Sequence, residues 1–355
     1  MYRPKLSDLP PILIDNDGNK VTTVSAWETK RRGEIYDIFA DKVYGRVPSI
    51  DIDVSHTMKR EENDQTIEYI VTITTKTQFG THSFDGYVSV PKSGKPCPVV
   101  ELIQFPYQVT SEFKPKLMKR GYALARFYYT DICTDDNNDF STGLHAVVKE
   151  ADGVRKSNTW GAIASWAWAA SRLMDAIAEI PEIDSSRAAI VGHSRTGKAS
   201  LWCGASDPRF KLVCSNESGC GGTAITRGKV GEHIKNICEG FPCWFCDTYK
   251  TFGDDEEHMP FDQHMLLALI APRCLYVPSA IDDTWSGPEP EYLAAKYCGE
   301  IYELYGKKGL GLEKYPIIGT VDQSGCVAYH LRRGGHSLSV YDWDEYINYA
   351  DKVLK

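Results

Sequence analysis

Ser194 stands at a turn that could make its hydroxyl a nucleophile. An apolar run over residues 187–191 ends at Gly192, and a helix-compatible run begins by Ala199. A serine at such a strand-to-helix turn is held with its hydroxyl exposed at the top of the sheet, as in the nucleophile elbow of serine hydrolases. The N-terminus of the next helix would supply N–H donors to a developing oxyanion. The plainer alternative is a serine that only caps the helix.

The turn departs from the usual G-x-S-x-G pattern at one position. It reads Gly192-His-Ser-Arg-Thr-Gly197, so the second glycine comes one place late. Gly192 still allows the turn to pass close to its neighbours, because it has no side chain. A serine nucleophile also needs a base and an acid that orients the base.

Two histidines compete for the role of base. His336 lies in the glycine-rich stretch Gly334-Gly-His336, after the last strand region and before the final helix, where a hydrolase of this kind carries its histidine. His330 lies on the preceding apolar segment, and there we expect a core or wall histidine. The position therefore favours His336.

Two acids compete for the role of orienting group. Asp283 follows an apolar run at residues 273–277, with Asp282 beside it, and Glu217 follows the run at residues 212–215. Glu217 could instead be a turn or capping residue, and Asp283 could cap a helix near Pro290. The sequence leaves both acids open.

The pattern of apolar residues predicts the elements that must position these groups. Residues 66–90 alternate in polarity about a turn near Gly80 and predict an antiparallel hairpin. Short apolar runs predict buried parallel strands at residues 99–103, 122–127, 187–191, 212–215 and 273–277. Apolar periodicity predicts a buried helix over 160–180 and an amphipathic helix near the C-terminus, and Ser25 is the expected cap of an early helix.

This order of elements indicates an α/β protein. We expect a three-layer α/β-hydrolase sandwich with a mostly parallel central sheet and an antiparallel N-terminal part. Residues 1–355 are expected to form a single catalytic domain, with residues 1–60 as an N-terminal segment packed on it.

Composition excludes several other classes. The 355 residues carry a net charge of −8 without a long basic run, so we expect no nucleic-acid partner. No apolar stretch reaches the ~18 residues that a membrane span needs. The first residues lack an apolar leader, which predicts a cytoplasmic protein, or a secreted one if a leader has been removed. The 11 cysteines, among them Cys243-Trp-Phe-Cys246, are expected to be mostly buried structural thiols rather than zinc or redox sites.

Several motifs in matching order resemble the glucuronoyl esterases, carbohydrate esterase family 15, and especially their bacterial branch. The resemblance covers most of the chain. The matching stretches are Tyr44-Gly-Arg-Val-Pro48, Gly192-His-Ser-Arg-Thr-Gly-Lys198, Ser215-Asn-Glu-Ser-Gly-Cys-Gly-Gly222, Trp244-Phe-Cys246, Pro260-Phe-Asp-Gln-His264, Ala268-Leu-Ile-Ala-Pro-Arg273, Asp283-Thr-Trp285 and Gly334-Gly-His336. The stretch Gln104-Phe-Pro-Tyr107 differs from the form expected for the family.

The resemblance implies a serine esterase that hydrolyses the ester between (4-O-methyl-)glucuronic acid side chains of glucuronoxylan and lignin alcohols. Ser194 would be the nucleophile and His336 the base. The family takes its acid either 23 residues after the serine, where Glu217 stands, or after the later strand, where Asp283 stands. The resemblance further implies that Arg195 stabilises the oxyanion. It also implies that three residues bind the uronate: Lys198, Glu232 and Trp285.

Other functions remain as alternatives at this stage. The same catalytic residues could hydrolyse an acetylated xylan or another carbohydrate ester. A peptidase is a further alternative, because the turn at Ser194 does not exclude it. A non-catalytic carbohydrate-binding protein is the alternative from another class, although nucleophile, base, acid and arginine are all present. We expect no metal and no cofactor, because the metal-ligand spacings are absent, and we expect a monomer.

Overall fold

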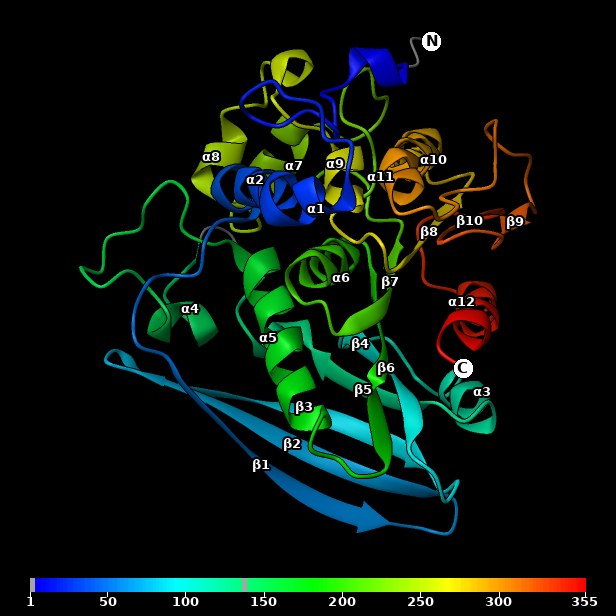
Figure 1. The fold of residues 1–355 in the computed structure, drawn as a ribbon. Helices are drawn as coiled ribbons and strands as arrows, with labels where there is room; N and C mark the ends of the chain where they lie inside the picture. Colours follow the sequence, from blue (N-terminus) through cyan, green and yellow to red (C-terminus); the bar gives the residue numbers. More distant parts are fainter. Residues whose placement is uncertain (1–3, 136–138) are drawn as a thin grey trace.

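The computed structural model describes residues 4–135 and 139–355. Its centre is a ten-stranded sheet with the order β1-β2-β3-β5-β4-β6-β7-β8-β10-β9 (Figure 1). The first three strands, β1 (Asp53–Glu62), β2 (Thr66–Thr77) and β3 (Gly80–Pro91), form an antiparallel meander. The predicted hairpin is therefore confirmed, and β1 is a strand that the alternation pattern did not predict.

The other half of the sheet is mostly parallel. Its parallel strands are β4 (Cys97–Gln104), β5 (Ala123–Tyr128), β6 (Ile183–His193), β7 (Phe210–Asn216), β8 (Cys274–Ala280) and β10 (Val327–Arg332). The short β9 (Val321–Asp322) pairs antiparallel with β10 at the edge. Neighbouring parallel strands end at the same edge of the sheet, which places the residues after β6, β7, β8 and β10 near one another.

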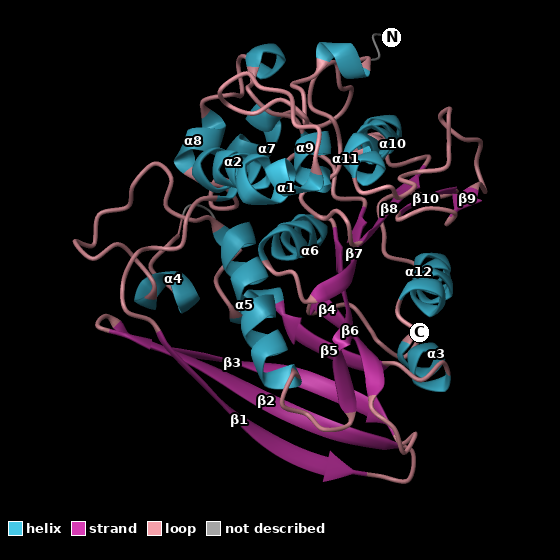
Figure 2. Cartoon of the chain, viewed as in Figure 1, coloured by secondary structure: helices cyan, strands magenta, loops and turns pink. Residues whose placement is uncertain are grey.

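Helices cover both faces of this sheet (Figure 2). On one face α5 (Ala162–Ile177) packs beside α6 (Arg195–Ser206), and on the other lie α3 (Lys114–Lys119) and α12 (Val340–Val353). Alternate strand residues supply two cores: Val213 and Leu275 pack on the α5–α6 side, while Leu212 and Tyr276 pack on the α12 side. This is the three-layer α/β sandwich that the sequence predicted.

The remaining helices lie mostly beyond the carboxyl ends of the strands. They are α1 (Val24–Ala26), α2 (Arg32–Phe39), α4 (Gly143–Val147), α7 (Ile234–Gly240), α8 (Asp247–Lys250), α9 (Gln263–Ala268), α10 (Pro288–Tyr297) and α11 (Gly299–Leu304). In the described part of the chain, 3₁₀ turns lie at Leu6–Asp8, Tyr129–Asp131 and Glu256–His258, and the π-helical segments Trp27–Arg31 and Ala40–Tyr44 continue directly from α1 and α2. The expected cap Ser25 is wrong: Thr23 caps α1 by accepting a hydrogen bond from Ala26 N.

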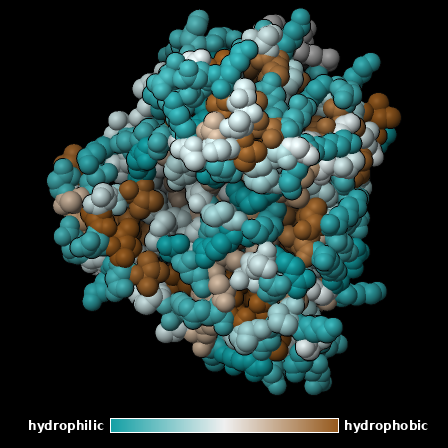
Figure 3. Space-filling view, viewed as in Figure 1, coloured by the Kyte–Doolittle hydropathy of each residue, from teal (hydrophilic) through white to brown (hydrophobic). Residues whose placement is uncertain are grey.

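The visible surface of the protein is mostly hydrophilic (Figure 3). Figure 3 shows hydrophilic side chains over most of the face seen, with hydrophobic ones in smaller patches. Among the described residues, no helix combines the length and the apolar character that a bilayer span demands.

Candidate active site

The turn between β6 and α6 holds Ser194 in a strained conformation. Ser194 has φ 56° and ψ −122°, a backbone geometry that L-residues rarely adopt. Its N–H donates to the carbonyl of Asn216 on β7 at 2.8 Å, which ties the turn to the sheet. Gly192 is required, because a Cβ there would lie 1.9 Å from the carbonyl oxygen of Thr196. These are the features of a nucleophile elbow.

The displaced glycine has a structural explanation. Thr196 occupies the place of the usual second glycine, and its hydroxyl accepts from the N–H of His193 at 2.9 Å and donates to the carbonyl of His193 at 3.0 Å. Gly197 follows because a Cβ there would lie 3.0 Å from the carbonyl oxygen of Asn216. The threonine hydroxyl closes the turn, and the next residue supplies the close approach to β7.

His336 meets both candidate acids, but at different distances. Its Nδ1 lies 2.7 Å from Oδ2 of Asp283 and 3.5 Å from Oε2 of Glu217. The hydroxyl of Ser286 lies 3.3 Å from the same nitrogen. Asp283 is therefore the acid in direct hydrogen-bond contact with the imidazole.

The rival histidine lies elsewhere. His330 is fully buried, with Nε2 2.9 Å from Oδ1 of Asp342 and Nδ1 3.1 Å from the hydroxyl of Tyr276. This confirms the sequence-based expectation that it is a core histidine.

The two acids differ in their electrostatic surroundings as well as in position. Burial alone would raise the pKa of Asp283, but hydrogen bonds from His336 and Ser286 lower it to about 2. Burial raises the pKa of Glu217 to about 10, against the opposing influence of the Arg332 guanidinium and the Ser337 N–H. At neutral pH Asp283 is thus the carboxylate that can hold the imidazole in one tautomer and stabilise its charged form.

Glu217 instead anchors the loop that carries His336. Its carboxyl accepts from Arg332 Nη2 through one oxygen and from the N–H of Ser337 at 2.9 Å through the other. The Arg332 guanidinium also donates to the carbonyls of Arg333, Gly335 and Ser337. Residues 333–337 therefore wrap around one buried guanidinium, and this fixes the base relative to the end of β10.

Arg195 is held beside the nucleophile by two groups, Asp135 and Trp244, that the sequence did not connect with it. Its guanidinium forms an ion pair with Asp135 and lies 4.6 Å from the ring centroid of Trp244. Asp135 also accepts from the indole N–H of Trp244 at 2.6 Å. Among the residues that the structure describes, Nε of Arg195 is buried without a hydrogen-bond partner. An unpaired donor next to the nucleophile is suited to a developing oxyanion.

The three predicted uronate-binding residues come together on one wall. Lys198 is buried one helical turn after Ser194, and burial lowers its pKa while Glu232 opposes that shift. Glu232 accepts from the indole N–H of Trp285 at 3.2 Å. Trp285 is 55% exposed, so part of its ring is free to lie against a sugar.

These groups line one cavity of about 250 Å³. The residues that line it are Phe105, Tyr107, His193, Ser194, Arg195, Lys198, Glu217, Glu232, Phe241, Trp244, Trp285, Ser286 and His336. Of the predicted site residues, Asp283 is the one outside this lining, since it lies behind His336. The stretch that departs from the expected family form supplies Phe105 and Tyr107 to the wall. The sequence did not predict that Phe105 and Tyr107 line the cavity, because the conformation of the loop determines which of its side chains face the cavity.

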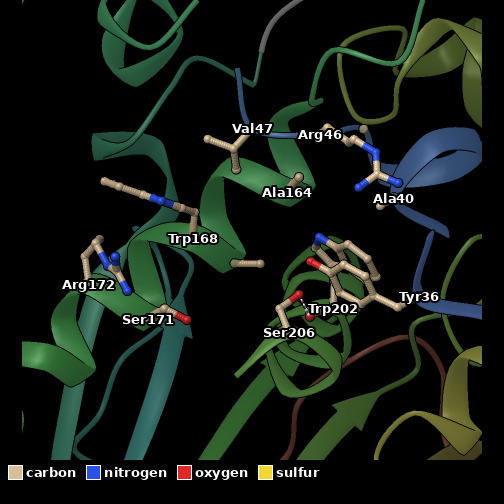
Figure 4. A pocket seen from close by; sticks show the side chains of 12 residues that line it. Tyr36, Ala40, Arg46, Val47, Ala164, Trp168, Ser171, Arg172, Trp202 and Ser206 are labelled. Atoms are coloured by element: carbon tan, nitrogen blue, oxygen red, sulfur yellow. Dashed lines mark hydrogen bonds between the residues drawn. The ribbon is translucent and has the colours of Figure 1, made fainter. Parts of the chain in front are cut away.

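A second cavity, of about 320 Å³, lies toward the other end of α6 (Figure 4). Tyr36 stacks on Trp202 at 5.0 Å, and Trp202 stacks in turn on Tyr44 at 4.6 Å. The Trp202 ring is thus stacked against two tyrosine rings, and the lining of the cavity contains neither a histidine nor an acid. This cavity lacks the groups for acyl transfer.

Glu217, Asp283 and His336 also place donor atoms within 4.8 Å of one another, as a metal site would. Here, however, the donor atoms already pair with one another, with Ser337 and with Arg332. The nearby guanidinium carries a positive charge that repels a cation. The donor set is better explained by acid–base chemistry than by metal binding.

A serine, a histidine and a carboxylate at the ends of neighbouring parallel strands are characteristic of α/β hydrolases. The family profile "Glucuronyl esterase, fungi" matches residues 71–306. "Carbohydrate esterase MZ0003", from an unknown prokaryotic organism, is 34% identical over 97% of this chain and 89% of its own. A "4-O-methyl-glucuronoyl methylesterase" from Schizophyllum commune is 27% identical over 84% of this chain and 74% of its own. The solved structure "Glucuronoyl Esterase from Solibacter usitatus" has a TM-score of 0.89, with 35% identity and 98% coverage of both chains.

The chain therefore belongs to the glucuronoyl esterases, carbohydrate esterase family 15. It is accordingly a carboxylic ester hydrolase with the α/β-hydrolase fold.

Proposed function

We propose that this protein hydrolyses the ester between a (4-O-methyl-)glucuronic acid side chain of glucuronoxylan and a lignin alcohol. The observation that carries the proposal is one cavity that joins the Ser194 elbow and His336 to a wall made by Lys198, Glu232 and Trp285. The relative from Schizophyllum commune is named for this class of ester. A polymer of this kind lies outside cells, so we expect the enzyme to meet it there or to act on imported fragments.

The reaction would begin at Ser194. Its Oγ attacks the uronoyl carbonyl while His336 takes the hydroxyl proton, and the carboxylate of Asp283 holds the imidazole. The oxyanion accepts hydrogen bonds from Nε of Arg195 and from the backbone N–H of Arg195 at the start of α6. His336 then protonates the departing alcohol, which leaves a serine ester of the uronic acid. Water, activated by His336, attacks this acyl-enzyme and releases the acid.

The wall beside the elbow would select the acyl group. Lys198 donates to hydroxyl or ring oxygens of the sugar, and Glu232 accepts from sugar hydroxyls. The exposed part of Trp285 packs against the sugar ring. A uronic acid ester uses all three groups, whereas an acetyl group reaches none of them.

The test compares benzyl glucuronate with an acetylated sugar ester, using the wild type and a Trp285→Ala variant. We expect the glucuronate ester to be preferred by the wild type, and the variant to lose that preference by roughly tenfold or more, as for loss of a stacking contact of 1–3 kcal/mol. A wild type that hydrolyses only the acetyl ester would favour the alternative carbohydrate esterase. Sugar binding without turnover of either ester would favour a binding protein.

A further inference from the structure

The two partly exposed cysteines of the chain are neighbours. Nine of the 11 cysteines are buried, and only Cys274 and Cys326 are partly accessible to solvent. Cys274 opens β8, and Cys326 immediately precedes β10, which runs parallel to β8. The N–H of Leu275 donates to the carbonyl of Cys326 at 2.9 Å, so the two backbones are already hydrogen-bonded at this point.

The side chains are in contact as well. The register of the two strands pairs Leu275 with Val327, which places Cys274 opposite Cys326 one step earlier. Residues opposite one another on adjacent strands lie within the range of Cα separations that a disulfide spans. The thiol of Cys274 is close enough to that of Cys326 to change its pKa, and Tyr349 on α12 is likewise close to Cys274.

The surroundings of this pair are those of a reactive thiol. The hydrogen bond from Cys274, with a smaller effect of Lys307, lowers the pKa of Cys326 below its usual range, although partial burial opposes this. The pKa of Cys274 is raised, because its thiol is the donor to Cys326 and is also partly buried. A partly exposed cysteine of lowered pKa beside a second thiol has the nucleophile and the resolving group that disulfide formation needs.

We propose that Cys274 and Cys326 form a reversible intramolecular disulfide when the protein meets a peroxide. The Cys326 thiolate attacks one oxygen of hydrogen peroxide, the O–O bond breaks and hydroxide leaves, which converts Cys326 to a sulfenic acid. The sulfur of Cys274 then attacks that sulfur, the S–O bond breaks, and water leaves with the thiol proton. Two thiols are oxidised to one disulfide, and one peroxide is reduced to two waters.

The position of the pair determines what the disulfide would do. Figure 1 shows β8 and β10 side by side, and the cysteines lie at their starting ends. Asp283 and His336 follow the other ends of these two strands, roughly 20 Å away along seven residues of β8. The bond would close the loop from residue 274 to 326 and join the two strands that carry acid and base. We therefore expect greater thermal stability with unchanged esterase turnover.

The experiment treats the whole purified protein with a small excess of hydrogen peroxide and maps its peptides without reduction. The expected result is a cross-link between the peptides of Cys274 and Cys326 and a fall from 11 to nine free thiols in denaturant. The melting temperature should rise by a few degrees and return after dithiothreitol. Unchanged thiols, a cross-link elsewhere or a disulfide-linked dimer would overturn the proposal.

Two matched variants separate the roles of the thiols. In Cys274→Ser the sulfenic acid should persist at Cys326 and be trapped by dimedone. In Cys326→Ser no cross-link forms, and Cys274 should resist dimedone. Dimedone labelling of Cys274 in Cys326→Ser, without labelling of Cys326 in Cys274→Ser, would contradict the assignment of Cys326 as the attacking thiol. The peptide map of the wild type decides the pairing even if a variant folds poorly, and it does not depend on the proposed substrate.

Discussion

At the scale of single residues, the two acids near His336 have separate roles. Asp283 is the direct partner of Nδ1, while Glu217 binds Arg332 and the N–H of Ser337. The sequence brought both acids to the site but could not distinguish them, because each follows a strand that ends at the same edge. The 0.8 Å difference in distance to the imidazole (3.5 against 2.7 Å) depends on loop conformations that no local pattern encodes.

This division predicts unequal effects of isosteric substitutions. Asp283→Asn should lower kcat by roughly three to four orders of magnitude, because the amide stabilises the wrong imidazole tautomer and no longer the imidazolium. Glu217→Gln should lower kcat by about tenfold or less, since an amide oxygen can still accept from Arg332 or Ser337. Steady-state hydrolysis of a glucuronate ester measures both. A larger loss in the glutamate variant would assign the orienting role to Glu217 instead.

At the scale of elements, the β6–α6 turn depends on a glycine that makes room for a carbonyl. Gly192→Ala should destabilise the protein by about 3 kcal/mol and abolish activity, because its Cβ would lie 1.9 Å from the Thr196 carbonyl oxygen. Gly33→Ala is the matched control. Gly33 lies in α2, a Cβ there meets nothing within 4 Å, and alanine should stabilise the helix by about 0.5–1 kcal/mol. Urea unfolding compares the two, and equal effects would contradict this account of the turn.

The central strand β4 carries a buried acid, Glu101, that makes the folded protein more stable at low pH than at high pH. Glu101 is fully buried, and neither carboxyl oxygen has a hydrogen-bond partner among the described residues. Burial raises its pKa well above the usual value. A raised pKa in the folded state gives stability that is complete below the unfolded pKa, near 4.3, and is lost as pH rises toward the folded value.

Glu101→Gln should therefore raise the free energy of unfolding at pH 8 relative to the wild type. The difference should become small near pH 4, where the wild-type carboxyl is mostly protonated in both states. Urea unfolding at the two pH values provides the measurement. A glutamine variant that is less stable at both values would indicate that the carboxylate contributes favourably to the core.

At the scale of the whole molecule, the order of elements was predictable and the assembly of the site was only partly so. Alternation and buried apolar runs placed β2 to β8 within a few residues, because burial on two faces demands continuous apolar sequence. Strand β1 is exposed along most of its length, so it left no such pattern. Asp135 and Trp244 were missed as partners of Arg195, since they reach it from distant loops.

We propose that the chain is a single catalytic domain and a monomer, with the N-terminal segment of residues 1–60 packed on it and the last residues of that segment entering the sheet as β1. One sheet includes strands from residue 53 to residue 332, which supports this organisation. Calorimetry should then show one unfolding transition, and light scattering a mass near 39.8 kDa. Two separate transitions would divide the chain into independent domains, and twice that mass would make it a dimer.

The most direct test of the proposed reaction is hydrolysis of benzyl glucuronate by the wild type and by Ser194→Ala. We predict that the wild type releases glucuronic acid and benzyl alcohol, and that the variant loses turnover by about 10³-fold or more while keeping its fold. Full activity in the variant would contradict the assignment of Ser194 as the nucleophile and, with it, the catalytic arrangement built around the β6–α6 turn.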